Sequence, residues 1–163
     1  MVALTDDMKR LVREQRLGFI ATVCPDGTPN LSPKGSTAVW DDSHLVFADV
    51  ESPRTIRNIV EHPWVEINVV DPIVRRGYRF KGKAEVLRSG DAYWKILEMY
   101  RRDGADVRRI RAIVRMEVAF AAPLTSPVYG QGVSEADVQR SWEEYHRRLR
   151  SSDTDVPRPL QDI

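Results

Sequence analysis

Several features that carry chemistry in other proteins are scarce or missing in this sequence of 163 residues. Its single cysteine, Cys24, excludes an intrachain disulfide and is typical of a protein from a reducing compartment. The three histidines, His44, His62 and His146, lack the HExxH spacing of a zinc hydrolase. A phosphate-binding Walker loop and a GxSxG nucleophile motif are also missing. We therefore predict no metal site and name no catalytic residue.

Long hydrophobic runs are also missing. The longest apolar stretch, residues 17–24, is far shorter than the ~18 residues that a membrane-spanning helix needs. Residues 1–10 contain no apolar signal-peptide core. We expect a cytoplasmic protein that has no membrane partner.

A net excess of charge is absent, since the formal net charge is +1. The charges are nevertheless unevenly distributed, because residues 75–115 hold thirteen basic and five acidic side chains. Such a basic segment raises the hypothesis of nucleic-acid binding. The same segment carries the alternating apolar residues of predicted strands and no aromatic stacking pattern on its polar face, which argues against a nucleic-acid partner.

The patterns that are present indicate antiparallel strands with a few helices. Helical spacing of apolar residues predicts helices that start after Thr5, at Pro53, near Tyr93 and after Ser134. Alternation and turn residues predict strands over residues 17–24, 30–40, 44–49, 64–70, 78–86 and 110–120. Six strands, mostly in hairpins, favour a closed antiparallel barrel with flanking helices, a mainly β (α+β) fold.

The character of the chain changes after Pro123. We expect residues 1–124 to form the barrel domain. Residues 125–163 are expected to form a loop, a helix and a polar tail that pack on the barrel or on a partner subunit.

Two polar segments are candidates for ligand binding. Residues 30–37 are unusually polar for a strand, and alternation places Ser32, Lys34 and Ser36 on one face. Hydroxyls beside an ammonium suit a phosphate or a polar ring edge, and Gly35 allows a flat ligand to approach the backbone. A bulged strand that faces solvent and binds nothing explains the same pattern equally well.

The second candidate is the start of the helix at residues 52–55. Backbone N–H groups at a helix N-terminus attract anions, and Arg54 and Thr55 add a guanidinium and a hydroxyl. An ordinary N-cap with a solvated arginine is the simpler alternative. Together, the two segments provide donors separated by one strand, which is an arrangement suited to one phosphorylated ligand.

The order and spacing of residues 18–33, 45–63 and 76–86 are similar to those of a known family. They resemble the pyridoxamine 5′-phosphate oxidase-like FMN-binding split barrels over roughly residues 5–121. The resemblance implies a six-stranded antiparallel split barrel that forms a homodimer, with FMN in a groove at the interface.

The resemblance also implies which residues hold the cofactor. The FMN phosphate is expected to contact Ser32, Lys34, Ser36, Arg54 and Thr55. The edge of the flavin ring is expected to lie against Pro33, Gly35, Thr37, Ala48 and Asp49. The partner subunit is expected to contribute its fifth strand, with Arg76 and Arg79.

Some residues depart from the vitamin B6 oxidases of this family. The Arg-Lys pair typical of those enzymes is Arg54-Thr55 here, and Trp142 and Arg148-Leu149 lie on a predicted helix rather than at the chain end. The resemblance therefore implies a general flavin-linked oxidoreductase with an unidentified small-molecule substrate. Two alternatives stay open. One is a deazaflavin F420-binding reductase that uses basic residues between Arg75 and Lys83, and the other is a non-enzymatic protein that binds flavin or nucleic acid.

Overall fold

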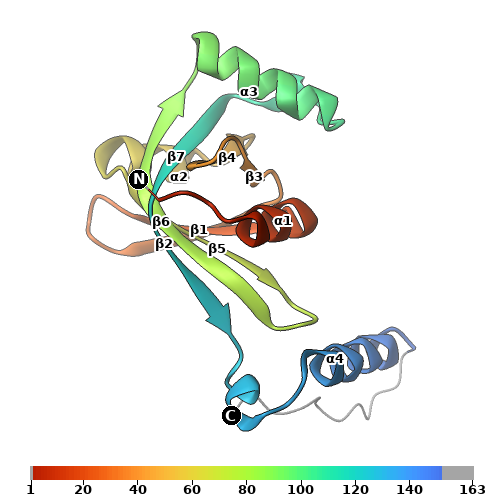
Figure 1. Cartoon of the computed structure of the whole chain (residues 1–163). Coiled ribbons are helices and arrows are strands. Elements are labelled where there is room, and N and C mark those ends of the chain that lie inside the picture. The colour runs from red at the N-terminus through yellow and green to blue at the C-terminus, as the bar shows by residue number, and fades with distance from the viewer. Residues whose placement is uncertain (1, 152–163) are drawn as a thin grey trace.

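The computed structural model describes residues 2–151, and the expected polar tail beyond Ser151 lies outside these residues. One antiparallel sheet dominates the fold, in the order β2-β1-β5-β6-β7-β4-β3 (Figure 1). Its strands are β1 (Gly18–Val23), β2 (Pro29–Lys34), β3 (Ala38–Val39), β4 (His44–Asp49), β5 (Trp64–Asp71), β6 (Arg76–Leu87) and β7 (Ala112–Thr125). The mainly β fold expected from the sequence is confirmed.

Four α-helices flank the sheet: α1 (Asp6–Gln15), α2 (Pro53–Glu61), α3 (Asp91–Arg102) and α4 (Glu135–Arg150). Thr5 caps α1 through its side chain, which accepts a hydrogen bond from the Met8 amide. Short 3-10 helices, η1 (Val107–Arg109) and η2 (Pro127–Gln131), precede β7 and α4. No described helix is long and apolar enough to cross a membrane.

The strand expected over residues 30–40 is divided in the structure, and the sheet therefore has seven strands. Its two halves, β2 and β3, lie at opposite edges of the sheet although only residues 35–37 separate them. So short a connection forces the sheet to curl until its two edges approach each other. The result is a split barrel, whose opening lies at residues 35–37.

Two apolar clusters hold this arrangement. Inside the curled sheet, Phe47, Ile67 and Phe80 are completely buried beside residues of α1 and α2. On the outer side of β4 and β7, Val46 and Ile113 pack against Ile96 of α3. Because alternate residues of β4 point to opposite faces, one strand serves both clusters and is fixed on both sides.

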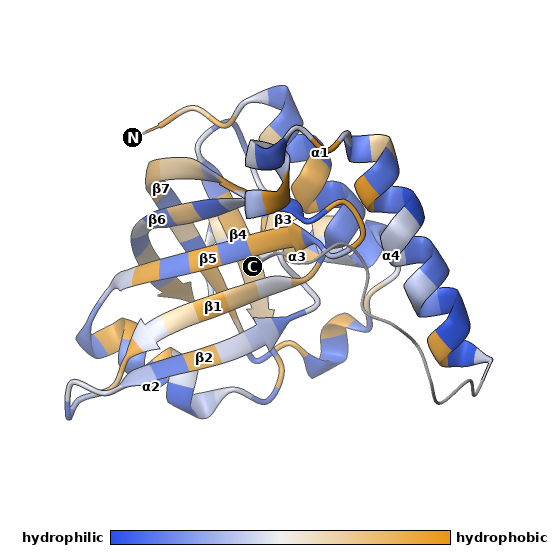
Figure 2. Ribbon diagram, turned by 90° about the horizontal axis from the view of Figure 1, so that it is seen from below, coloured by the Kyte–Doolittle hydropathy of each residue, from blue (hydrophilic) through white to orange (hydrophobic). Residues whose placement is uncertain are grey.

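The C-terminal segment stands apart from the barrel, with η2 and α4 below the sheet in Figure 1. Ser134 caps α4 as expected, since its hydroxyl accepts from the Asp137 amide at 3.2 Å. Two neighbouring arginines, Arg75 in the β5–β6 turn and Arg76 at the start of β6, contact α4. Arg75 lies over the Trp142 ring, and Arg76 pairs with Glu135 at 3.3 Å. In Figure 2, α4 is mainly hydrophilic.

Candidate functional site

Three segments of the chain meet where the barrel is split. They are the end of β2 with the linker after it, the end of β4, and the start of α2. The hydrogen bonds of Lys34 and Ser36 join all three, as described below. The two polar segments singled out in the sequence are therefore brought into one cluster by the curl of the sheet. We call Ser32, Lys34, Ser36, Asp49 and Ser52 the Lys34 cluster.

Lys34 is the centre of this cluster. Its side chain is buried, with the residue only 8% exposed, and its Nζ donates to Ser32 Oγ at 2.6 Å and to Ser52 Oγ at 2.5 Å. Burial lowers the pKa of Lys34, while the neighbouring Asp49 carboxylate raises it in part. An ammonium held in a partly desolvated place is a strong attractor for an anion.

Asp49 and Ser52 complete the polar side of the cluster. Asp49, at the end of β4, is buried and its Oδ1 accepts from the Ser52 amide at 2.8 Å. Ser52 stands at the N-cap position of α2, yet its side chain makes no capping hydrogen bond. It accepts from Lys34 instead, which sequence reasoning missed because Ser before Pro at a helix start is typical of a cap. No pattern in the sequence indicated the contact between Ser52 and Lys34.

The linker of residues 35–37 is fastened by its own polar groups. Ser36 Oγ accepts from the amide of Ala48, a buried residue of β4, at 2.9 Å, and the Tyr100 hydroxyl donates to the Ser36 carbonyl at 2.7 Å. Thr37 is buried and donates to the Lys34 carbonyl at 2.9 Å. Burial raises the pKa of Tyr100, so its hydroxyl stays protonated as a donor, and no pattern in the sequence indicated its contact with Ser36.

The remaining residues expected around the cofactor surround the cluster. Pro33, Gly35 and Arg54 are exposed, and Thr55 is buried in the first turn of α2. Because Pro53 has no N–H, the first amides of α2 that can bind an anion are those of Arg54 and Thr55. Arg54 has no ion pair among the described residues, so its guanidinium is available to a ligand.

Arg76 and Arg79 lie elsewhere in this chain. They belong to β6, and their partners are Glu135 at 3.3 Å and Glu66 at 2.9 Å. Arg76 also lies over the ring of Tyr129. Among the described residues no contact joins either arginine to the Lys34 cluster, so within one chain they are not part of it.

The donor set of the Lys34 cluster fits a phosphate. Ser32 and Ser52 accept from the ammonium, so each hydroxyl keeps its own proton to donate to an anion. The ammonium, the two hydroxyls and the amides at the start of α2 are groups that bind phosphate oxygens. No cluster of three or more metal-ligating side chains occurs among residues 2–151.

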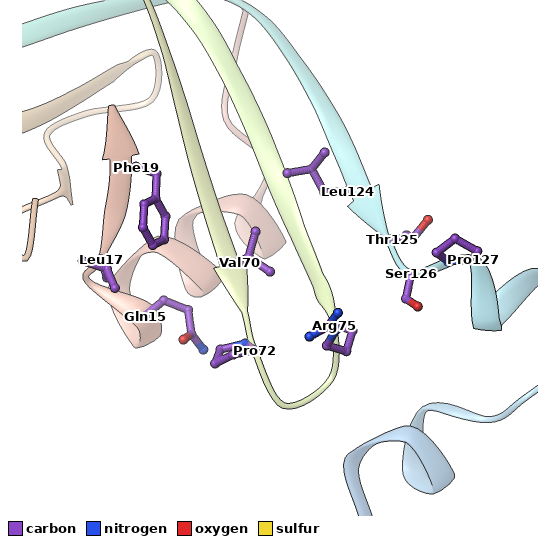
Figure 3. Close-up of a pocket in the computed structure, with 10 residues that line it drawn as sticks. All are labelled: Gln15, Leu17, Phe19, Val70, Pro72, Arg75, Leu124, Thr125, Ser126 and Pro127. Carbon is purple, nitrogen blue, oxygen red and sulfur yellow. The ribbon is translucent and has the colours of Figure 1, made fainter. Parts of the chain in front are cut away.

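An apolar cavity of ≈ 600 Å³ lies beside the β5–β6 turn (Figure 3). Leu17 and Phe19 line one side, Val70 the centre, and Leu124 and Pro127 the other side. Its polar lining residues are Gln15, Arg75, Thr125 and Ser126. The cavity therefore suits an apolar or aromatic group with a polar edge.

The family model for pyridoxamine 5′-phosphate oxidase matches residues 4–122, which is more than half of the chain. This chain belongs to the pyridoxamine 5′-phosphate oxidase family. The matched region contains β1 to β6, all of β7 except its last three residues, and every residue of the Lys34 cluster. The family expected from the sequence is confirmed.

Two individual proteins are similar to this chain over most of its length. An uncharacterized protein of Methanocaldococcus jannaschii, MJ0282, is 33% identical over 100 residues, which are 60% of this chain and 65% of that protein's length. The structure of HupZ from Group A Streptococcus is 32% identical with a TM-score of 0.68, covering 76% of this chain and 95% of HupZ.

Two more distant structures show the same fold. An FMN-binding protein of Syntrophomonas wolfei is 14% identical with a TM-score of 0.61, covering 72% of this chain and 84% of its own. A protein named F420 reductase is 24% identical with a TM-score of 0.58, covering 73% and 98%. At these identities the likeness concerns the fold alone.

Proposed function

We propose that this protein binds FMN and acts in the cytoplasm as a flavin-dependent oxidoreductase on a small-molecule substrate. The observation that carries the proposal is the buried ammonium of Lys34 between two serine hydroxyls at the split of the barrel. The family match, together with the fold that this chain shares with an FMN-binding protein, supports the choice of flavin.

In this proposal the cluster binds and orients the cofactor. Lys34, the two hydroxyls and Arg54 hold the phosphate, and the amides of Arg54 and Thr55 donate to it. The exposed backbone at Pro33 and Gly35 would lie against the ring edge, and Gly35 leaves room because nothing lies within 4 Å of a Cβ placed on it. A bound flavin would supply the redox chemistry, and the residues of this chain would bind and orient it.

We further propose that the functional unit is a homodimer. The outer face of the sheet exposes Phe19 and Leu31, which are 41% and 64% exposed, and further along it Trp64 and Phe120. Apolar surface of this extent on one face of a sheet is typical of a protein interface. In such a dimer, Arg76 and Arg79 of the partner would face the cofactor, and the cavity of Figure 3 would lie beside it for the substrate.

Deazaflavin F420 is the second candidate cofactor, because the F420 reductase shares this fold. The two candidates differ in their absorbance. A spectrum of the purified protein, followed by mass analysis of the small molecule released on denaturation, identifies whichever is bound. Titration of the protein with each cofactor then compares their affinities. Absence of binding by both at micromolar concentration would overturn the proposal.

The Arg54→Ala variant tests the phosphate site. Loss of one charge-assisted hydrogen bond should weaken FMN binding by ~1.5–3 kcal/mol, which is on the order of 10- to 100-fold in dissociation constant. The measurement is the quenching of flavin fluorescence. Arg13→Ala is the matched control, because Arg13 is an exposed arginine on α1. If the Arg54→Ala variant binds FMN as tightly as the Arg13→Ala variant does, the phosphate does not bind at the start of α2.

A further inference from the structure

A second cavity, of ≈ 460 Å³, lies beside α2. Three arginines line it: Arg57 from α2, Arg88 just after β6, and Arg111 just before β7. They come from three parts of the chain, and only the fold brings them together. The proposed cofactor site uses none of them.

The three guanidinium groups lack the ion pairs that other arginines of this chain make. Arg79 pairs with Glu66 at 2.9 Å and Arg101 with Glu98 at 2.7 Å. By contrast, within residues 2–151 no ion pair involves Arg57, Arg88 or Arg111. Three neighbouring cations without carboxylate partners repel one another, and an anion between them relieves this repulsion.

Two carboxylates also line the cavity and reduce its positive charge only in part. Asp49 is buried and already accepts from the Ser52 amide at 2.8 Å. Glu61 is exposed at the end of α2 and forms no ion pair with Arg57, although the two are one helical turn apart. The formal charge of the lining therefore stays positive.

The rest of the lining is apolar. Pro53, Ile56 and Ala112 lie beside Val60, which is 65% exposed although it is a large aliphatic residue. We propose that this cavity is a second anion-binding site, which binds a phosphate or carboxylate group carried on an apolar body. The arginines hold the anionic group by charge-assisted hydrogen bonds, and the aliphatic residues cover the apolar part.

This site shares one residue, Asp49, with the Lys34 cluster, and none of its cations belongs to that cluster. Lys34, Ser32 and Arg54 do not line the second cavity. The two sites are therefore neighbours with different cations. Loss of one set of cations leaves the other set in place, so the second site can be tested whether or not the protein binds a flavin.

The test compares phenyl phosphate with inorganic phosphate, because the two carry the same anionic group and differ in the apolar body. Binding of each is measured by calorimetry at low salt on the full chain carrying Lys34→Met, which weakens the first site. We expect phenyl phosphate to bind at least about fivefold more tightly than inorganic phosphate. Adding Arg57→Gln and Arg111→Gln should weaken phenyl phosphate at least about tenfold.

The control removes the same number of charges elsewhere. Arg13 and Arg109 are exposed, and the Arg13→Gln/Arg109→Gln variant should bind phenyl phosphate as the Lys34→Met protein does. Val60→Ser should reduce only the preference for the phenyl group. Thermal melting of each variant shows that it is folded.

Three results would overturn the proposal. These are no binding of either probe at millimolar concentration, an equal loss in the control variant, or an undiminished affinity in the Arg57→Gln/Arg111→Gln variant. FMN affinity of the Arg57→Gln/Arg111→Gln variant in an otherwise natural chain should equal that of the natural protein. This measurement separates failure of the second site from failure of the proposed cofactor site.

Discussion

Among single residues, Lys34 has two opposite effects. Its buried charge destabilises the folded chain, and the same charge favours the binding of an anion. Burial lowers its pKa, which means that the charged ammonium is less stable in the folded chain than in the unfolded chain. Between the lowered pKa and the ordinary value of 10.5, the unfolded chain binds more protons. The free energy of unfolding therefore rises with pH across this window.

The Lys34→Met variant separates these two effects. Methionine has a similar length and no charge, so we expect a higher melting temperature at pH 7 and a smaller rise in stability towards pH 10. FMN binding should weaken by ~1.5–3 kcal/mol, because one charge-assisted contact is lost. Thermal melts at several pH values and flavin titrations measure both effects. A variant that is less stable at pH 7 and binds FMN normally would contradict both parts.

Ser52 shows how one residue changes its role in the folded chain. Its place before Pro53 predicts an N-cap, and it does occupy that position. Its hydroxyl nevertheless accepts from Lys34 of β2, which is 18 residues earlier in the chain. Local sequence determines where α2 starts, whereas the partner of the hydroxyl depends on how the sheet curls.

At the scale of elements, the pairing of β6 with β7 depends on one glycine. The register shifts between Lys81 and Gly82, and a Cβ on Gly82 would lie 2.0 Å from the Glu117 carbonyl oxygen. A backbone oxygen in a paired strand cannot move aside without breaking hydrogen bonds of the sheet. The close approach of β6 and β7 therefore requires glycine here.

We expect Gly82→Ala to destabilise the fold by ~1–3 kcal/mol, which is the usual cost of overpacking. Gly130→Ala is the matched control, since nothing lies within 4 Å of a Cβ at Gly130. Chemical denaturation of both variants gives the comparison. Equal midpoints for Gly82→Ala and Gly130→Ala would show that the sheet adjusts at the bulge.

The division of the expected strand into β2 and β3 also depends on how the elements pair. The polar run of residues 30–37 predicts an irregular strand, but not that its halves lie at opposite sheet edges. Pairing between β4 and β7 and between β1 and β5 decides this, and those strands are far apart in sequence. Non-local pairing leaves no periodic signal in a single sequence.

At the scale of the whole molecule, the outer face of the sheet predicts self-association. Alternation along β1 and β2 places Phe19 and Leu31 on the face away from the buried Ile20. We expect Leu31→Asp to convert a dimer to a monomer in light scattering, because a carboxylate is costly to bury at an interface. Val60→Asp, at an equally exposed position on α2, should leave the dimer intact. A natural protein that is monomeric at all concentrations would contradict the dimer itself.

The structure shows where the basic residues of the 75–115 segment lie and which of them are paired with acidic side chains. Several basic residues of the 75–115 segment pair with acids far away in sequence, such as Arg79 with Glu66 and Arg76 with Glu135. Arg88 and Arg111 line the second cavity without such partners within residues 2–151. The basic excess is thus partly neutralised by the fold and partly gathered at one cavity.

Local patterns in the sequence specify the type and order of most elements and the two polar segments that form the site. Hydrophobic periodicity and turn residues act over a few positions, so they can be read locally. Three features follow from the folding of the whole chain. The strand of residues 30–40 is divided, and Ser52 and Tyr100 join the site. Arg57, Arg88 and Arg111 share a cavity. These features depend on side chains that are far apart in sequence and meet only through the curl of the sheet.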